Sequence, residues 1–465
     1  MIYNSNEDTV AALATAGGTG AIACIRVSGR ESVEIVSRIF FLRKGNFSES
    51  ASGRMRMGSI MSGNELLDEA LAVIFRSPGS YTGEDVVEIS CHGSQYIVRK
   101  ILSLLIENGC RLARPGEYTQ RAFLNGKMDL SQAEAVADLI ASSSASAHRI
   151  ALNQMRGGFS NKLRELRTEL LDFVSLIELE LDFSEEDVEF ADRNKLSGLV
   201  SHIAGTIDRL VESFEAGNAI KNGIPVAIVG ETNTGKSTLL NLLLHDEKAI
   251  VSEIHGTTRD AIEDCISIGG ILFRFIDTAG IRETRDAVET VGIERTFRKI
   301  GEADIVLWLV DVNSENARIE ELAKKILPPS AGKKLILVFN KLDCAEPDDA
   351  VQKEHLLADS IPDRLFISAR HKINIDRLEN ALVEAGYLPE TDSQDVTVTN
   401  VRHFEALKNA RQAILRVENG LAQNIPGELL SRDIRECMGF LGEITGEIST
   451  DEILGNIFGK FCIGK

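Results

Sequence analysis

Apolar residues in the first quarter of the chain follow two different patterns. Short apolar runs typical of strands occur at Ala23–Val27, Ala70–Phe75 and Val86–Cys91. A helical repeat follows them, and Gly109 suits its C-terminal cap. The apolar positions of this helix are Ile97, Ile101, Leu104 and Leu105. Residues 1–118 are therefore predicted to form an α+β domain.

The pattern becomes purely helical from Ser131. Ser131 and Glu134 have the spacing of a capping box, in which each side chain bonds the backbone amide of the other residue. After the break at Gly157-Gly158, one apolar stripe continues at helical spacing. Its members are Leu163, Leu166, Leu170, Val174, Ile177 and Leu181. No strand pattern returns before Ile224, so residues 119–220 are predicted to be helical.

Strand and helix patterns alternate from Ile224 to about Leu388, which is typical of a parallel, doubly wound α/β sheet. A polar stretch, Pro389–Asn400, then leads into a second helical region. The simplest organisation is one helical domain, divided in sequence by an inserted α/β domain. We therefore predict a multi-domain protein. Its parts are an N-terminal α+β domain at 1–118, a helical domain formed by 119–220 and 389–465, and an inserted α/β domain at 221–388.

Composition narrows the class of protein. The chain has 465 residues, 43% of them hydrophobic and 26% charged, which is ordinary for soluble globular domains. The apolar run Ile305–Val310 is far too short to span a bilayer, so we expect a cytoplasmic protein without membrane association. A net charge of -19 would repel nucleic acid at long range, which leaves RNA contact to a local basic patch or to a partner. The seven cysteines have neither disulfide-framework nor zinc-site spacing.

A glycine-rich segment follows the apolar run Pro225–Val229. Its sequence is Gly230-Glu231-Thr232-Asn233-Thr234-Gly235-Lys236-Ser237, and apolar helical positions come next. Glycines let backbone amides approach phosphate, Lys236 can reach the terminal phosphates, and Ser237 can bind magnesium. Because a strand precedes the segment and a helix follows it, a plain glycine turn explains it poorly. We predict a phosphate-binding loop.

Three further motifs end successive strand patterns of the same domain. They are Asp277-Thr278-Ala279-Gly280 after Ile271–Ile276, Asn340-Lys341-Leu342-Asp343 after Leu335–Phe339, and Ser368-Ala369-Arg370 after Leu365–Ile367. The Asp277 carboxylate can hold the magnesium shell, and the Gly280 amide can sense the γ-phosphate. Since ligands bind at the carboxyl ends of strands in open α/β sheets, the motifs are expected to meet around one nucleotide.

Asp343 selects the base, because a carboxylate accepts hydrogen bonds from the ring N–H and the exocyclic amine of guanine, and adenine offers no such pair. The inserted domain resembles the translation-factor-related GTPases, which implies binding of GTP with Mg²⁺ and GTP hydrolysis. The residues assigned to nucleotide binding by the motifs and the resemblance are Asn233, Thr234, Gly235, Lys236, Ser237, Thr238, Ser252, Glu253, Ile254, His255, Gly256, Thr257, Thr258, Asp277, Thr278, Ala279, Gly280, Asn340, Lys341, Asp343, Ser368, Ala369 and Arg370.

Ile281 directly follows Gly280, where Ras-like proteins place the glutamine that orients the attacking water, so hydrolysis needs another organiser. The phosphate loop and the segment 252–259 resemble GTPases that bind K⁺ beside the phosphates and are activated when two G domains meet face to face. The resemblance implies Asn233, Ser252, Ile254 and Thr257 as potassium ligands, and Ser237 and Thr258 as magnesium ligands. Taken alone, the loop asparagine also fits a simple turn.

Three carboxylates after the Asp277 motif are candidates to orient the attacking water. They are Glu283, Asp286 and Glu289. By spacing alone each is better explained as a solvated residue of a switch segment. The resemblance singles out Glu289 as the catalytic carboxylate.

Motifs near both ends of the chain extend the resemblance. They are Ile25-Arg26-Val27-Ser28-Gly29, Thr82-Gly83-Glu84-Asp85-Val86-Val87-Glu88, Ala113-Arg114-Pro115-Gly116-Glu117, Arg121-Ala122-Phe123-Leu124-Asn125-Gly126-Lys127 and Phe461-Cys462-Ile463-Gly464-Lys465. Together with the nucleotide motifs they resemble the MnmE (TrmE) family of tRNA modification GTPases over nearly the whole chain.

This resemblance implies a homodimer whose N-terminal domains bind a one-carbon tetrahydrofolate, 5,10-methylenetetrahydrofolate, with 5-formyltetrahydrofolate as an analogue. Arg26, Glu88, Lys127 and Lys465 would contact the folate, and Cys462 would be needed for modification. The resemblance also implies an FAD-dependent partner, MnmG (GidA), with which the family adds a carboxymethylaminomethyl-type group to carbon five of the wobble uridine of certain tRNAs.

Two alternatives stay open from the residues alone. The four folate residues would otherwise be ordinary surface charges, and Cys462 equally fits a packed cysteine. The GTPase motifs by themselves also suit a GTP-dependent binding switch in ribosome assembly. Such a switch would be expected to carry a recognisable RNA-binding module.

Overall fold

The structure is a computed structural model of the chain. It describes residues 8–182, 193–245, 264–276, 298–345, 353–386, 396–447, 451–459, 461 and 464. Contacts between residues divide the chain into two compact units. The first holds Met1–Ala137, Gln154–Phe190 and Gly427–Lys465, and the second holds Asp138–Asn153 and Ala191–Pro426.

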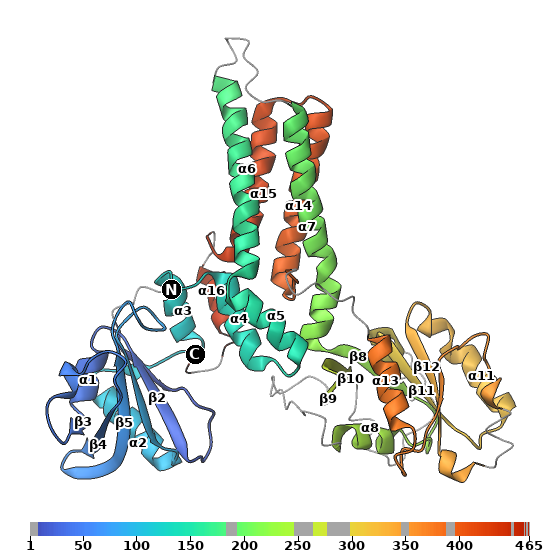
Figure 1. The fold of residues 1–465 in the computed structure, drawn as a ribbon, viewed down its shortest axis with the longest axis horizontal. Helices are drawn as coiled ribbons and strands as arrows, with labels where there is room; N and C mark the ends of the chain where they lie inside the picture. Colours follow the sequence, from blue (N-terminus) through green and yellow to red (C-terminus); the bar gives the residue numbers. More distant parts are fainter. Residues whose placement is uncertain are drawn as a thin grey trace. The chain divides into compact units, whose positions relative to one another are not determined.

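A seven-stranded sheet forms the N-terminal part of the first unit (Figure 1), with the strand order β3-β4-β5-β6-β2-β1-β7. The strands are β1 (Val10–Leu13), β2 (Ile22–Ser28), β3 (Phe40–Leu42), β4 (Arg56–Ser62), β5 (Glu65–Phe75), β6 (Val86–His92) and β7 (Arg111–Leu112). Neighbouring strands are antiparallel, except that β1 and β7 are parallel. The α+β class predicted for this region is confirmed, including the strands predicted around residues 23, 70 and 86.

Helices α1 (Ser32–Ser37) and α2 (Gln95–Glu107) supply the apolar cover of one sheet face. Ile25 of β2 packs there with Ile35 and Ile101 of the two helices, and all three are fully buried. The helix predicted after β6 is confirmed, and the positive φ of Gly109 ends it. Because side chains alternate along a strand, the residues between the buried ones project from the opposite face.

The remaining helices of the first unit are α3 (Glu117–Leu124), α4 (Leu130–Ala141), α6 (Gly158–Asp182), α15 (Gly427–Thr445) and α16 (Asp451–Phe458), and α4 runs on past the boundary of the unit. Helix α6 packs along α15 (Figure 1), although the two are far apart in sequence. The apolar stripe predicted for α6 is buried at Leu163, Leu166, Leu170, Val174 and Ile177. Packing of this stripe, rather than local helix propensity, supplies most of the stability of so long a helix.

The capping box predicted at Ser131 and Glu134 is wrong. Helix α4 begins at Leu130, so the capping residue is Asp129. The Asp129 carboxylate accepts from the amide of Gln132 at 3.0 Å, and the Gln132 side chain accepts from the Asp129 amide at 3.0 Å. The Ser131 hydroxyl is instead buried against Ser160, at 2.8 Å. An aspartate two residues earlier offered the same reciprocal geometry, and the burial of Ser131 decided between the two.

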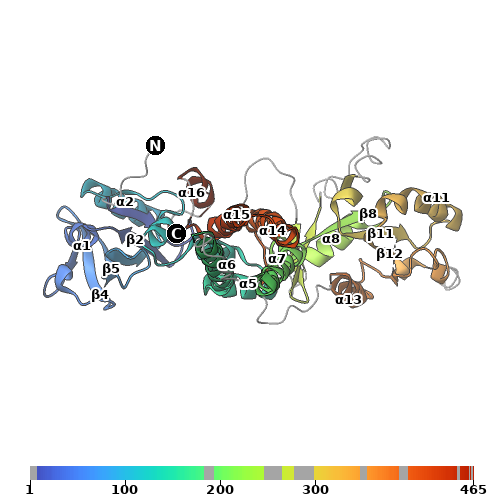
Figure 2. The same cartoon turned by 90° about the horizontal axis from the view of Figure 1, so that it is seen from above.

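Helices α5 (Ala145–Met155), α7 (Arg193–Asn222) and α14 (Val401–Ala422) belong wholly or mainly to the second unit. Helix α7 lies along α14 (Figure 2), and the rings of Phe214 and Phe404 stack with their centroids 4.3 Å apart. Asn400 caps α14 by accepting a hydrogen bond from the amide of Arg402. Two segments separated by the whole inserted domain therefore form one helical pair.

The inserted domain is a six-stranded sheet with the order β13-β12-β11-β8-β10-β9. The strands are β8 (Ile224–Val229), β9 (Asp264–Ile268), β10 (Ile271–Phe275), β11 (Ile305–Asp311), β12 (Lys334–Asn340) and β13 (Arg364–Phe366). Helices α8 (Lys236–His245) and α13 (Ile375–Ala385) pack on one face, and α11 (Asn316–Ile326) packs on the other. The predicted doubly wound α/β fold is confirmed.

The expectation of a fully parallel sheet is wrong at one edge. Strands β9 and β10 pair antiparallel, with Ile268 opposite Ile271. Only Gly269 and Gly270 connect them, at φ values of 59° and 83°. A two-residue turn with positive φ at both positions makes a hairpin, whereas a parallel crossover needs a dozen residues or more.

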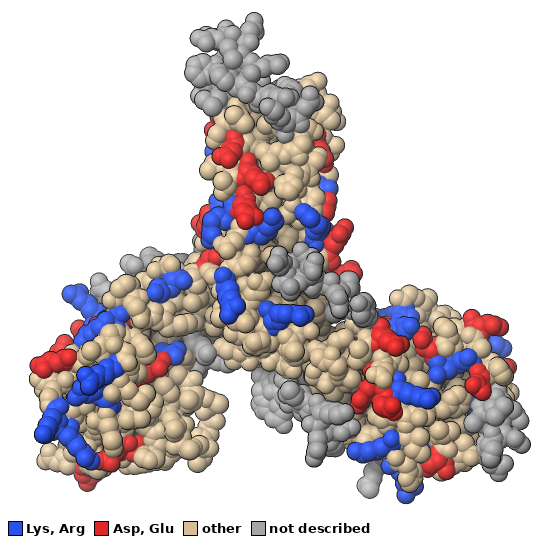
Figure 3. All heavy atoms as spheres, viewed as in Figure 1, with Lys and Arg blue, Asp and Glu red and all other residues tan. Residues whose placement is uncertain are grey.

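No helix within the described residues is both long and apolar enough to cross a bilayer. Helices α6 and α7 have 25 and 30 residues, yet both carry charged side chains along their length. In the view of Figure 3, Lys and Arg side chains are interspersed with Asp and Glu on the surfaces of both units.

Candidate functional site

The phosphate loop predicted at Gly230–Ser237 connects β8 to α8, which begins at Lys236. Its backbone is too close to neighbouring atoms for larger residues at two positions. A Cβ on Gly230 would lie 2.2 Å from the carbonyl oxygen of Leu309, and one on Gly235 would lie 2.2 Å from Nδ2 of Asn340. Both glycines also have positive φ, at 153° and 97°. These positions require glycine, as the sequence motif predicts.

The Lys236 ammonium donates hydrogen bonds to the backbone at the start of this loop. Its Nζ donates to the carbonyl oxygens of Gly230 at 2.9 Å and Glu231 at 2.6 Å, and the Thr234 hydroxyl donates to the Glu231 oxygen at 2.9 Å. Burial lowers the pKa of Lys236, and the nearby Lys299 lowers it further. The two carbonyl contacts offset this effect and hold the ammonium beside the first amides of α8, which also favour an anion.

Asn340 joins three loops of the inserted domain. Its Nδ2 donates to the carbonyl of Thr234 in the phosphate loop at 2.8 Å, and its Oδ1 accepts from the amide of Ala369 at 3.0 Å. The side chain is 3% exposed, so both bonds are shielded from water. Sequence reasoning assigned Asn340 to nucleotide contact, and the structure adds that it fixes the phosphate loop to the loop after β13.

Asp343 presents a carboxylate beside the loop after β13. Its Oδ1 accepts from the Ser368 hydroxyl at 2.5 Å, and its Oδ2 accepts from the Cys344 thiol at 3.2 Å. These two hydrogen bonds, that of Ser368 foremost, lower the pKa of the Asp343 carboxyl. Both donors are neutral, so the carboxylate keeps its negative charge and further lone pairs for a ligand.

The described nucleotide residues lie on loops at the carboxyl ends of β8, β12 and β13, as predicted. Asn233 has a left-handed φ of 63° and is exposed, Ser237 and Thr238 lie in the first turn of α8, and Arg370 is exposed after β13. Lys341 pairs with Asp311 at 2.7 Å, a partner at the end of β11 that sequence reasoning missed. Outside the described residues lie Ser252, Glu253, Ile254, His255, Gly256, Thr257, Thr258, Asp277, Thr278, Ala279, Gly280, Glu289, Cys462 and Lys465.

A second candidate site lies on the face of the N-terminal sheet opposite α1 and α2. Arg26 of β2 stands opposite Glu88 of β6, and its Nε and Nη2 both donate to Glu88 Oε1, at 2.8 and 2.7 Å. The guanidinium also lies over the rings of Tyr81 and Tyr118, 5.6 Å from each centroid. The predicted pair is thus brought together, and the two tyrosines are members that the motifs did not indicate.

The end of the chain reaches this same site. Nη1 of Arg26 lies 3.4 Å from the carbonyl oxygen of Gly464. A Cβ on Gly464 would lie 2.3 Å from the carbonyl of Leu13, and Gly464 has a φ of 97°, so only glycine fits there. A Cβ on Gly116 would lie 2.6 Å from the carbonyl of Phe458 at the end of α16. Two glycine contacts therefore seat the C-terminal tail on the N-terminal domain.

Lys127, the remaining described member of the predicted folate set, has a different setting. Its ammonium donates to the carbonyl of Pro78 at 2.8 Å, and its stem packs near Gly83. The structure thus brings Arg26 and Glu88 into direct contact and places Lys127 beside another loop.

A buried ion network supports the second site from below. Glu117, the first residue of α3, accepts from Arg111 at 2.6 and 2.8 Å, from Arg121 at 3.0 Å and from the amide of Arg114 at 2.8 Å. Burial alone would raise the pKa of Glu117, but these donors outweigh it and hold the pKa at about 2. The next residue, Tyr118, donates to the carbonyl of Arg26 at 2.7 Å. The network therefore fixes the ring beneath the Arg26 guanidinium.

The chain is similar to proteins of known family in sequence and in structure. A family model described as the MnmE helical domain matches residues 130–462, and one described as the GTP-binding protein TrmE N-terminus matches residues 9–127. Proteins named tRNA modification GTPase MnmE from Bacteroides thetaiotaomicron and Bacteroides fragilis are each 58% identical to it over 468 residues, covering 99% of this chain and 100% of theirs. Among solved structures, a variant of Aquifex aeolicus Era bound to GDP·AlF4⁻ matches with 29% identity and a TM-score of 0.28, covering 41% of this chain and 66% of Era.

Proposed function

The chain belongs to the MnmE family of tRNA modification GTPases, and from this premise we propose that its nucleotide site is the set of loops after β8, β12 and β13. The chain hydrolyses GTP, and hydrolysis is coupled to tRNA modification. The observation that carries the site proposal is the Asn340 side chain, which fixes the phosphate loop on one side and the loop beside Asp343 on the other. One ligand can therefore reach Lys236 with its phosphates and Asp343 with its base.

The chemistry of these residues fits a guanine nucleotide. Lys236 and the amides at the start of α8 favour phosphate, and Ser237 in the same turn can ligate the Mg²⁺ that GTPases use. The charged Asp343 carboxylate suits the two donors of guanine. The proposed residues outside the described part, Thr258 and Asp277 among them, would complete the magnesium shell.

We propose that K⁺ stimulates hydrolysis and that Glu289 orients the attacking water. Support comes from Ile281, which cannot act as the glutamine of Ras-like proteins, and from Asn233, whose exposed position in the phosphate loop suits a ligand to a cation beside the phosphates. Ser252, Ile254 and Thr257 would complete the potassium ligands. Exchange of K⁺ for Na⁺ should depress the hydrolysis rate, and Glu289→Ala should bind GTP normally but turn it over slowly. Equal rates in both cations would contradict the potassium site.

The second site is proposed to bind a one-carbon tetrahydrofolate. The sheet face opposite α1 and α2 offers a carboxylate, Glu88, which is an acceptor for the N–H groups of a pterin ring, and a guanidinium, Arg26, held over two aromatic rings. Both Arg26 bonds go to one oxygen of Glu88, Oε1. Lys127 and Lys465 are the other proposed contacts, and the bound folate would supply the one-carbon unit, with 5,10-methylenetetrahydrofolate as the donor. Titration of the full chain with 5-formyltetrahydrofolate should show binding that Arg26→Ala and Glu88→Ala both abolish.

We propose that two copies of the chain pair through the N-terminal domain. Large apolar side chains are exposed on the same sheet face as Arg26: Met57 at 56% and Leu71 at 39%, which stand opposite each other, Phe41 at 50% and Ile22 at 69%. An exposed apolar surface beside polar groups is typical of an interface. Sedimentation of Met57→Glu should show monomer where the wild type sediments as a dimer. A monomeric wild type would contradict the proposal.

The modification itself is proposed to need the FAD-dependent partner MnmG and the thiol of Cys462, and to place a carboxymethylaminomethyl-type group on carbon five of the wobble uridine in the cytoplasm. Nucleoside mass spectrometry of tRNA from cells that lack the chain is the direct test. Loss of the modified wobble uridine, restored by the wild type and not by Cys462→Ser, is expected. An unaltered uridine pattern would favour a GTP-dependent binding switch instead.

A further inference from the structure

We infer that Arg318 neutralises the Glu231 carboxylate of the phosphate loop, so that the loop can accept the negative charge of a nucleotide. Glu231 is the second residue of the loop, and Arg318 lies in the first turn of α11, 87 residues later in the chain. The inference rests on the proposed assignment of Gly230–Ser237 as the phosphate loop. It adds a residue from outside every nucleotide motif.

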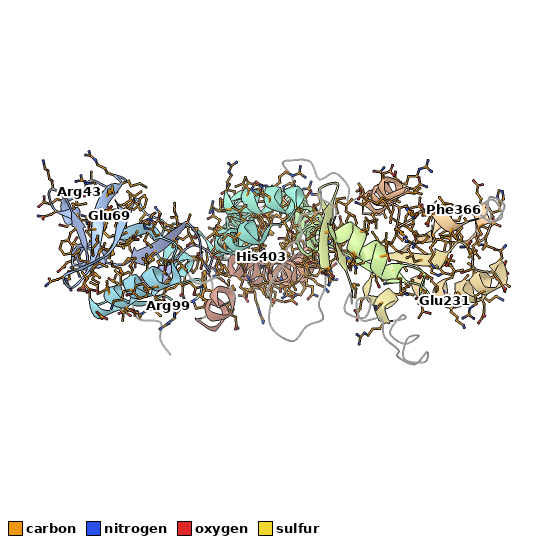
Figure 4. All side chains as sticks on the ribbon, turned by 90° about the horizontal axis from the view of Figure 1, so that it is seen from below. Arg43, Glu69, Arg99, Glu231, Phe366 and His403 are labelled. Carbon is orange, nitrogen blue, oxygen red and sulfur yellow. The ribbon has the colours of Figure 1, made fainter. Side chains whose placement is uncertain are left out.

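The contact between the two side chains is direct. Nε and Nη2 of Arg318 donate to Oε1 of Glu231 at 2.9 and 2.7 Å. The Glu231 side chain, labelled in Figure 4, is 37% exposed, and that of Arg318 is 44% exposed. The remaining guanidinium nitrogen, Nη1, donates to Glu321 one turn further along α11 at 2.8 Å. The carboxylate of the loop is therefore paired with a cation that a second helix residue keeps in position.

Glu231 is closely connected to the phosphate-binding group of the loop. Its own carbonyl oxygen accepts from Lys236 Nζ and from the Thr234 hydroxyl. The Glu231 side chain is therefore only a few covalent bonds away from the carbonyl oxygen that accepts from the Lys236 ammonium. A carboxylate at this position repels the phosphates of a nucleotide unless a cation offsets it, since like charges repel over the short distances at which salt does not screen them.

The position of Arg318 in its helix also needs an explanation. A cation in the first turn of a helix opposes the helix dipole, which weakens the helix. The neighbouring Ile319 is 1% exposed and anchors this turn in the core of the domain, so the guanidinium starts from a fixed point. An exposed ion pair contributes little to folding. The pair is therefore better explained by an effect on the ligand than by an effect on stability.

The direction in which each variant changes nucleotide affinity distinguishes charge neutralisation from a purely structural role of the ion pair. If Arg318 neutralises Glu231, removing the arginine weakens nucleotide binding, removing the glutamate strengthens it, and removing both restores most of the loss. If the pair serves only to hold the loop in shape, each single variant weakens binding and the double variant is no better than either. A double-mutant cycle measures this difference directly.

The test uses the full chain and titrates fluorescent GDP onto Arg318→Gln, Glu231→Gln and the double variant at low salt. Arg318→Gln is expected to bind GDP about threefold to tenfold more weakly, and Glu231→Gln to bind it more tightly than the wild type. The double variant should recover at least half of the GDP affinity lost in Arg318→Gln. The differences in GDP affinity among the four proteins should shrink at high salt. Unchanged affinity in Arg318→Gln, or a double variant as weak as it, would overturn the inference.

Two further variants keep the result interpretable. Lys325→Gln removes the same charge from the same helix, where Lys325 pairs with Glu321 at 3.0 Å and does not contact the loop, so its GDP affinity should match the wild type. Lys236→Ala tests the loop assignment itself and should lose GDP binding. If Lys236→Ala binds GDP normally, the assignment of the loop fails; if it loses binding while Arg318→Gln does not, only the inference about Arg318 fails.

Discussion

The phosphate loop and the Arg26 site bring charged groups together in different ways. In the loop, eight consecutive residues hold one ammonium against their own carbonyl oxygens. At the second site, Arg26 meets Glu88 across 62 residues and Gly464 across 438 residues. The loop can therefore form as soon as β8 and α8 pack. The second site exists only when two strands and the C-terminal tail are all in place.

The carboxylates of the two regions differ in their partners. Asp343 accepts hydrogen bonds from a hydroxyl and a thiol, both neutral, with the His371 ring 3.5 Å from Oδ2, whereas Glu88 and Glu117 accept from arginines. A carboxylate with neutral donors keeps its net charge for a ligand. A carboxylate paired with arginine contributes first to the geometry of its site, and it loses that contribution when it is protonated.

Asp343→Asn gives the largest expected effect on ligand binding and tests the first half of this comparison. The amide can no longer accept both hydrogen bonds from guanine, so GTP affinity should fall on the order of a hundredfold, since bonds to a charged group contribute about 1.5–3 kcal/mol each. Affinity for xanthosine triphosphate should rise. Competition titrations with both nucleotides measure the change. Asp363→Asn, which alters a carboxylate paired with Lys334 in the same domain, is the matched control; unchanged GTP affinity in Asp343→Asn would rule out the base assignment.

Glu117→Gln tests the paired carboxylates. The folded-state pKa of Glu117 is lowered to about 2, so its contribution to stability is complete above its unfolded pKa and is lost as the pH falls from about 5 toward 2. At pH 7 the variant should be less stable by about 3 kcal/mol. Thermal unfolding of the full chain at several pH values measures the difference between the proteins.

That difference should shrink steadily below pH 5. Glu34→Gln, which removes an exposed partner of Arg38, should change little at any pH. A constant gap between wild type and Glu117→Gln from pH 7 to pH 3 would show that the carboxylate charge is not what the network uses.

Gly464→Ala gives the smallest expected energetic effect and tests whether the tail belongs to the second site. A methyl group at this position meets the Leu13 carbonyl and a left-handed backbone, at a cost of about 1–3 kcal/mol. The tail should leave the sheet, so tRNA modification should fall while GTP hydrolysis stays normal. Gly439→Ala on α15, where a Cβ would meet open space, should alter neither activity. Equal loss of both activities in Gly464→Ala would contradict a separate site.

Local patterns in the sequence were sufficient for most of the elements and for the phosphate loop. The apolar periodicity located β2, β5, β6, α2 and the long α6. Two features depended on competition between close alternatives. Asp129 and Ser131 both suit a helix cap, and burial of the serine decided the outcome. The second is the pairing of β9 with β10, where the alternating pattern predicted a parallel sheet and the two-residue turn Gly269-Gly270 makes a hairpin instead.

The second site was not predictable from the residues around it. Nothing in the spacing of Arg26, Glu88 and Gly464 places them together, and only the family resemblance drew attention to the first two. The strand register brings Arg26 and Glu88 together, because it sets the two residues directly opposite each other. Tyr81 and Tyr118 carry no signal in the sequence, since aromatic residues in a sheet domain are usually core residues.

The sequence by itself determined the helices, the strands and the chemistry of the nucleotide loops, because each depends on residues within a few positions of one another. The tertiary structure alone decided that Asn340 joins the phosphate loop to the loop after β13, that Arg318 meets Glu231, and that the C-terminal tail reaches Arg26. The last two contacts join residues 87 and 438 positions apart. Such pairs form only after sheet register and helix packing are set, and hydrophobic burial across the whole domain, not any local pattern, sets them.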